Sequence, residues 1–183
     1  MTALPKAKMT VDEFLAWSAT VPGRHELVNG EIFAMSPDRV GHTRMKFSAQ
    51  IALRDAIGRA GVPCHMLPDG ATVRIEQRTA YEPDALVYCG PRLDDDLVEV
   101  PNPVIVVEVL SPGTKGHDTG EKLVGYFRLP SVQHYLILDP VQKLVIHHRR
   151  GAEMIETRIA GEGLLSLDPP GLKVTVGALF AED

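Results

Sequence analysis

The stretch PVIVVEVLSP, residues 103–112, decides the fold. A β-branched and aliphatic run bounded by prolines is typical of a strand buried on both faces at the centre of a sheet. One carboxylate, Glu108, interrupts this run. Because an ionised carboxylate inside such a strand is costly without a partner or a metal ion, Glu108 marks a candidate functional site.

Composition restricts the class of protein. The chain has 183 residues, 44% of them hydrophobic, which predicts one globular domain over residues 1–183 with a frayed lead-in at residues 1–9. The formal net charge of −5 argues against bulk electrostatic coating of nucleic acid, so any polyanion must be bound locally. No apolar run approaches the roughly 18 residues of a membrane span. Two cysteines without CxxC spacing predict a reducing cytoplasm and no disulfide framework.

Local patterns predict the other elements. Thr10 and Glu13 form a capping box at the start of a short helix that ends before Pro22. Residues 40–60 have the periodicity of an amphipathic helix. Strands are expected at 64–67, 71–76, 84–88, 103–110, 134–140, 143–149, 153–159 and 172–176, with a helix at 118–128 and a closing helical turn at 176–182.

The dipeptide Asn29-Gly30 predicts a two-residue type I′ hairpin between two alternating segments. In that register Val28 pairs with Glu31 and Glu26 pairs with Phe33, so both glutamates project from the same face. Either glutamate taken alone could equally be a solvent-facing residue.

Acidic and basic residues from separate segments are expected to converge. Pro83-Asp84 opens one strand, Glu108 lies in the next long strand, and Lys122 lies on the helix that follows. If the two strands are neighbours, Asp84 and Glu108 can share a hard cation such as Mg²⁺, which prefers oxygen ligands and needs only one or two carboxylates plus a carbonyl. Lys122 could orient water, stabilise phosphoryl charge or simply neutralise the carboxylates.

The order of these motifs resembles a known family. The chain carries, in sequence, ELVNGE, MSP, His42, Pro83-Asp84, VEVLSP, Asp118 with Lys122 and Tyr126, and YLILDP. This set, from about residue 10 to the C-terminus, resembles the Uma-two family of restriction-endonuclease-like proteins, in the PD-(D/E)XK nuclease superfamily. The resemblance implies an α/β fold with an α+β mixed sheet flanked by helices. It also implies Mg²⁺-dependent endonuclease activity on the phosphodiester bonds of nucleic acid, with DNA as the expected substrate, and a homodimer.

The same resemblance assigns roles to residues. Asp84 matches the aspartate of the PD motif and Glu108 the second acid, but Leu110 stands where the superfamily has its lysine. The family resembled places the lysine on the next helix, which maps to Lys122. The implied catalytic set is Glu31, Asp84, Glu108 and Lys122, with Glu26, His42 and Tyr126 as accessory candidates. Mg²⁺, or Mn²⁺ as a substitute, would be held by Asp84, Glu108 and the backbone carbonyl of Val109.

Alternatives remain open at this point. A module with the same fold could bind nucleic acid without turnover through basic residues of the 40–60 helix, namely Arg44, Lys46, Arg54 and Arg59, or could serve only as a structural dimer. His42 has an ordinary surface or capping role as its rival interpretation, and Tyr126 a core role. His147 and His148 are adjacent on a strand and point to opposite faces, so they cannot chelate one ion well.

Overall fold

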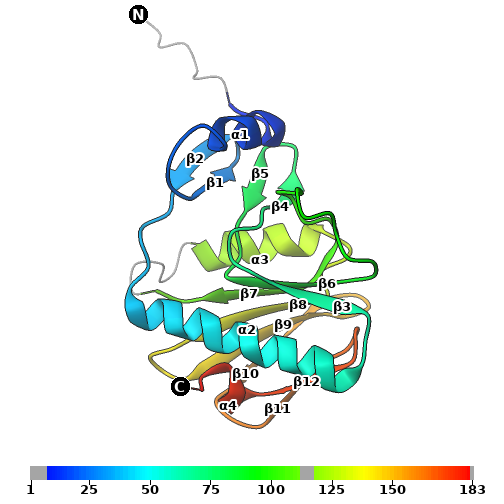
Figure 1. Ribbon diagram of the computed structural model, residues 1–183. Helices are drawn as coiled ribbons and strands as arrows, with labels where there is room; N and C mark the ends of the chain where they lie inside the picture. Colours follow the sequence, from blue (N-terminus) through cyan, green and yellow to red (C-terminus); the bar gives the residue numbers. More distant parts are fainter. Residues whose placement is uncertain (1–7, 112–117, 182–183) are drawn as a thin grey trace, which may run out of the picture.

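The central strand lies where its sequence predicts. A computed structural model of the protein describes residues 8–111 and 118–181, except for the side chains of residues 118 and 119 (Figure 1). Strand β7, Pro103–Val109, lies inside a six-stranded sheet of order β10-β9-β8-β7-β6-β3. It pairs in parallel with β8 and antiparallel with β6, so the sheet is mixed. The expected mixed sheet flanked by helices is therefore confirmed.

The remaining strands of this sheet follow the predicted segments closely. They are β3 (Cys64–Pro68), β6 (Ala85–Cys89), β8 (His134–Asp139), β9 (Leu144–Arg150) and β10 (Ile155–Ala160). The hairpin of β8 and β9 and the strand after it were expected from apolar runs separated by turn residues. Element ends differ from the predictions by one or two residues, as is usual at strand termini.

Alternating side chains of β7 divide the interior into two layers. Ile105, Val107 and Val109 pack in a cluster with helix α2, Val40–Ala60, while Val106 packs on the opposite face. The second face is covered by helix α3, Asp118–Arg128 (Figure 1). On the α2 side the cluster also includes β11 (Leu164–Leu167), β12 (Leu172–Thr175) and α4 (Val176–Leu179). Glu108 belongs to the face that α3 covers, in agreement with the predicted alternation.

A smaller sheet stands beside the large one. Its order is β2-β1-β5-β4, and helix α1, Val11–Ser18, packs against it (Figure 1). The four strands are β1 (His25–Val28), β2 (Glu31–Ala34), β4 (Val73–Glu76) and β5 (Thr79–Tyr81). Asn29 and Gly30 have φ values of 52° and 82°, which is the type I′ geometry, and the predicted register of the hairpin is present.

The cap of α1 agrees with the prediction, whereas the described end of the N-terminal lead-in differs from it and two strands were unexpected. Thr10 and Glu13 form the capping box of α1. Residues 1–7 of the predicted frayed lead-in and the side chain of Asp118 lie outside the described residues. Met9, inside that lead-in, donates its N–H to the carbonyl of Gly30. Strands β5 and β11 were not predicted. In the described residues, no helix has both the length and the apolar character to cross a membrane.

The expectation about cysteines was wrong. Cys64 and Cys89 form a disulfide between β3 and β6. The two residues are direct cross-strand partners in the β3–β6 register, which brings their side chains together although they are far apart in sequence. The lack of CxxC spacing therefore carried no information about pairing, and the cysteine count no longer supports a reducing compartment.

Candidate active site

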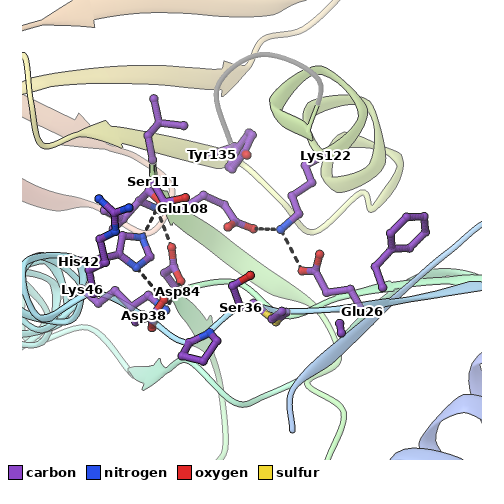
Figure 2. Close-up of a pocket in the computed structure, with 17 residues that line it drawn as sticks. Glu26, Ser36, Asp38, His42, Lys46, Asp84, Glu108, Ser111, Lys122 and Tyr135 are labelled. Carbon is purple, nitrogen blue, oxygen red and sulfur yellow. Dashed lines mark hydrogen bonds and ion pairs between the residues drawn. The ribbon is translucent and has the colours of Figure 1, made fainter. Parts of the chain in front are cut away.

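A cavity of about 540 Å³ opens beside the end of β7. Its walls come from the β1–β2 hairpin, the start of α2 and the segment that leads into it, the residue before β6, the end of β7, β8 and α3 (Figure 2). The charged residues that line it are Glu26, Asp38, Arg39, Lys46, Asp84, Glu108 and Lys122, together with His42. The structure thus brings the two predicted metal-binding acids and the predicted lysine to one cavity.

Two side chains of α3 donate hydrogen bonds to Glu108. Its Oε1 accepts a hydrogen bond from Lys122 Nζ at 3.0 Å and another from the Tyr126 hydroxyl at 2.8 Å. Lys122 and Tyr126 are one helical turn apart, so α3 presents both donors to the same carboxylate. Gly125 lies between them, and a Cβ there would come within 2.7 Å of the Tyr81 ring, so glycine lets α3 approach closely. Tyr126 is both a buried core residue and a hydrogen-bond donor to Glu108.

Asp84 forms an ion pair with a lysine of α2, the helix on the opposite face of the sheet from α3. It directly precedes β6, and its Oδ2 accepts the N–H of Val109 at 2.7 Å. Its Oδ1 lies 2.7 Å from Nζ of Lys46, which comes from α2. Each acid of the pair is therefore neutralised by an ammonium group from a different helix, on either side of the sheet. Within the described residues, no group of three or more His, Cys, Asp or Glu side chains is arranged to hold a metal ion.

His42 links the start of α2 to the end of β7. Its Nε2 lies 2.9 Å from the carbonyl oxygen of Val109, and its Nδ1 lies 2.8 Å from Oδ1 of Asp38. Val109, whose carbonyl was predicted as a metal ligand, thus lines the cavity, and that carbonyl is hydrogen-bonded to the predicted accessory histidine. Asp38 also accepts a hydrogen bond from Lys46 at 2.7 Å, which ties this group to Asp84.

The two hairpin glutamates have different surroundings. Glu26 is buried, lines the cavity, and accepts hydrogen bonds from Lys122 Nζ at 2.9 Å and from the N–H of Glu82 at 2.8 Å. Glu31 is exposed on the edge strand β2 and is not among the residues that line the cavity. The geometry therefore favours Glu26, although the family resemblance had favoured Glu31. The inner strand β1 turns its glutamate toward α3, whereas the edge strand leaves its glutamate in solvent.

Burial and neighbouring charges together set the electrostatics of the cavity. Burial raises the pKa of the Glu108 carboxyl to about 8, with Asp84 and Glu26 adding to the shift while Lys122 and Tyr126 oppose it. Burial alone would lower the pKa of Lys46, but Asp84, Asp38 and Asp69 raise it, so this ammonium stays charged. A cation bound beside Glu108 would favour its charged carboxylate, as Lys122 does.

Sequence reasoning missed most of the α2 side of the site. Lys46 was assigned to a basic helix surface, yet it is 3% exposed and also contacts Asp69, which in turn pairs with Arg24. Its position could have signalled burial, because it is on the same helical stripe as Ala49 and Leu53. The other basic residues of that hypothesis, Arg44, Arg54 and Arg59, are exposed as expected.

Fold and site together define a protein with a restriction-endonuclease-like fold. A crystal structure from Anabaena variabilis, described as a putative nuclease belonging to DUF820, has a TM-score of 0.70 to this chain at 17% identity. That likeness covers 94% of this chain and 97% of the other, and it concerns the fold.

Residues 11–177 match the model of the Uma2 family, described as "Putative restriction endonuclease", and the chain belongs to this family. It is also similar to two uncharacterized proteins of Synechocystis sp. The first, slr1290, is 26% identical over 179 residues, covering 96% of this chain and 93% of that protein. The second, sll1609, is 26% identical over 158 residues, covering 84% of this chain and 89% of that protein.

Proposed function

We propose that this protein is a Mg²⁺-dependent endonuclease that hydrolyses phosphodiester bonds of nucleic acid, with DNA as the substrate. The observation that carries the proposal is the meeting of Asp84 and Glu108 in one cavity, with Lys122 against Glu108. Two acids on neighbouring strands can hold a metal ion for phosphodiester hydrolysis, and a lysine brought to them by α3 can stabilise the charge that develops. Membership of the Uma2 family supports the same activity.

The residues present fit a hard divalent cation. Asp84, Glu108 and the carbonyl of Val109 all supply oxygen, and Mg²⁺ usually takes few protein ligands and keeps several waters. The acids that line the cavity, Glu26, Asp38, Asp84 and Glu108, outnumber its cations, Arg39, Lys46 and Lys122, and such an ion would add positive charge beside them. When bound, Mg²⁺ would polarise the phosphoryl group and lower the pKa of a water molecule, and Mn²⁺ would serve as a substitute.

The other residues of the site act through position and charge. Lys122, held between Glu108 and Glu26, places an ammonium group where it stabilises negative charge on a phosphoryl oxygen or orients the attacking water. Tyr126 fixes the Glu108 carboxylate from the core side, and its own pKa is raised by burial, so the hydroxyl remains a donor. His42 orients the Val109 carbonyl.

Metal-dependent cleavage is the direct test. Purified protein is expected to cut nucleic acid in Mg²⁺ or Mn²⁺ and to show no cutting in EDTA, because the carboxylates alone cannot polarise the phosphodiester. Gel assays on plasmid DNA, duplex oligonucleotides and single strands measure the products. Cleavage that persists undiminished in EDTA, or its absence with every metal and substrate form, would contradict the proposal.

The two hairpin glutamates form a matched pair for testing the role of Glu26. Glu26→Gln is expected to reduce Mg²⁺-dependent cleavage about tenfold or more, because Lys122 loses one of the two charged partners that position it. Glu31→Gln, an identical change on the adjacent strand of the hairpin, is expected to leave the rate within about twofold. Initial rates of oligonucleotide cleavage at saturating metal compare the two. Equal losses, or a larger loss for Glu31→Gln, would contradict the assignment of the Lys122-positioning role to Glu26.

One observation favours a second candidate, a nucleic-acid-binding or dimeric module that no longer turns over. Lys46 already contacts Asp84 and Lys122 already contacts Glu108, so both acids have a cation without any metal. Binding that needs no metal, together with no cleavage in the assay above, would support this candidate.

The proposal extends to assembly and location. A homodimer is supported by the edge strand β10, which exposes Ile155 and Ile159 beside unpaired backbone groups. A cytoplasmic location is proposed from the DNA substrate alone, because the Cys64–Cys89 disulfide is more typical of an oxidising compartment.

A further inference from the structure

Exposed aromatic residues gather at the mouth of the site. The chain has ten aromatic residues (Phe, Trp and Tyr), all within the described part, and only Phe33 and Phe47 are exposed, at 51% and 50%. Phe33 comes from β2 and lines the main cavity, directly across the hairpin from Glu26. Phe47 comes from α2, one residue after Lys46. An exposed aromatic ring beside the cavity offers a flat surface on which a nucleobase can stack.

Phe47 lines a second cavity that adjoins the first. This cavity, of about 290 Å³, shares Asp38 with the main one and is lined also by Val40, Thr43 and Arg44. Its size is at the lower end of the range of small-ligand sites. An exposed aromatic ring, a flanking aliphatic side chain and an arginine are the elements on which an unpaired nucleobase stacks while its phosphate is neutralised.

Basic residues accompany the two rings. Arg39, in the main cavity wall, and Arg44, in the second, are both exposed near the start of α2. Asp38, which lines both cavities, is already paired with Lys46 and His42. The rim therefore offers positive charge for a phosphate backbone although the chain as a whole is acidic.

The depth of the site favours a flexible strand. Asp84 and Lys122 are 4% and 6% exposed, so a phosphate must enter the recess to reach them. Duplex DNA is stiff over roughly 150 base pairs, and bending it sharply within a short site has a high cost. A single strand bends freely and can place one phosphate inside while its bases remain at the rim.

We infer that Phe33 and Phe47 are stacking platforms for unpaired bases on either side of the phosphate to be cut, and that the substrate is single-stranded nucleic acid or an unpaired segment of it. Arg39 and Arg44 contact the backbone between the platforms. The inference rests on the proposed function in locating the reacting phosphate at Asp84 and Glu108. It goes further in naming the strandedness of the substrate and the residues that select it.

Binding without metal tests this inference separately from catalysis. Fluorescence anisotropy in EDTA compares a labelled 12-nucleotide oligo-dT with a 12-base-pair duplex closed as a hairpin. The single strand is expected to bind at least about tenfold more tightly than the duplex. Phe33→Ala and Phe47→Ala are each expected to weaken single-strand binding about tenfold. Met154→Ala is the control, since Met154 is 71% exposed between β9 and β10, at the other end of the sheet.

The outcomes separate the two proposals. Tighter binding of the duplex, or phenylalanine variants that bind like Met154→Ala, would overturn the inference even if the protein cuts DNA. A Phe47→Ala variant that turns a dimer into a monomer by light scattering, with single-strand affinity unchanged, would overturn it in favour of an interface between copies. Phenylalanine-dependent binding of the single strand supports it, even if no metal ever produces cleavage and the proposed nuclease function fails.

Discussion

Replacing Asp84 with asparagine or Glu108 with glutamine is expected to lower Mg²⁺-dependent cleavage at least about a thousandfold. Each change removes one of the two charged oxygen ligands proposed for the metal, and a thousandfold corresponds to about 4 kcal/mol of transition-state stabilisation. The initial rate on an oligonucleotide substrate, measured over a range of Mg²⁺ concentrations, separates weaker metal binding from a slower chemical step.

Both substitutions should leave the fold intact, so the loss can be read as a loss of function. Asparagine at position 84 can still accept the N–H of Val109, and Lys46 keeps Asp38 and Asp69 as partners. Glutamine at position 108 keeps an oxygen that can accept from Lys122 and Tyr126, and Lys122 keeps Glu26 as a charged partner. Thermal melts followed by circular dichroism verify this.

Asp69→Asn is the matched control. Asp69 contacts the same Lys46 ammonium as Asp84, at 3.2 Å, but it does not line the cavity. If the role of Asp84 is metal binding, Asp69→Asn should change the rate less than about threefold. A loss of the same size in Asp69→Asn would mean that Asp84 acts through the charge balance of Lys46, and the metal role would have to be abandoned.

The fold was predictable where local signals were strong. The apolar run of β7, the Asn29-Gly30 turn and the long periodic helix α2 each carry a pattern that tertiary contacts reinforce. β5 has only three residues and no alternation to detect, yet it joins β1 to β4 and so completes the small sheet. The cysteine pair could not be foreseen either, because it depends on the register between β3 and β6.

The same distinction applies to the site: residues with a strong signal in the sequence could be predicted, and residues placed by tertiary packing could not. Asp84 and Glu108 could be found because a carboxylate inside or beside an apolar strand is anomalous in sequence, and Lys122 was found from its helical spacing and from the family resemblance. The choice between Glu26 and Glu31 could not be made, since both lie on one face of the hairpin and only the packing of β1 against β5 and α3 distinguishes them. Lys46 was overlooked because a lysine on a helix is usually exposed, and its three acidic partners come from three separate loops.

Lowering the pH from 7 to 4 is expected to reduce the free energy of unfolding by several kcal/mol because of a buried histidine pair far from the acids. His134 on β8 and His147 on β9 are both buried, and His134 Nδ1 lies 2.9 Å from His147 Nε2. His134 Nε2 lies 3.0 Å from the carbonyl oxygen of Pro169. With Nε2–H donating to that carbonyl, Nδ1 of His134 is left to accept from His147, and both rings are neutral.

Burial lowers the pKa of both histidines to about 4. In the unfolded chain each would titrate near 6.5, so between these values the unfolded state binds more protons than the folded state. The stabilisation is therefore complete above about pH 6.5 and is lost as the pH falls toward 4. A shift of this size corresponds to about 3 kcal/mol for one histidine, and the second protonation adds repulsion between neighbouring rings.

Urea unfolding at intervals between pH 7 and pH 4, followed through the single tryptophan, Trp17, measures the loss. His147→Gln keeps a nitrogen donor for His134 but cannot be protonated. Between pH 7 and pH 4 its free energy of unfolding should therefore fall by about 3 kcal/mol less than that of the unaltered protein. His65→Gln is the control, because His65 is only half-buried on the edge strand β3 and should leave the pH dependence unchanged. If His147→Gln and the unaltered protein lose stability in parallel, acid sensitivity comes from the carboxylate network around Lys46 and Arg24, and the histidine pair is not its source.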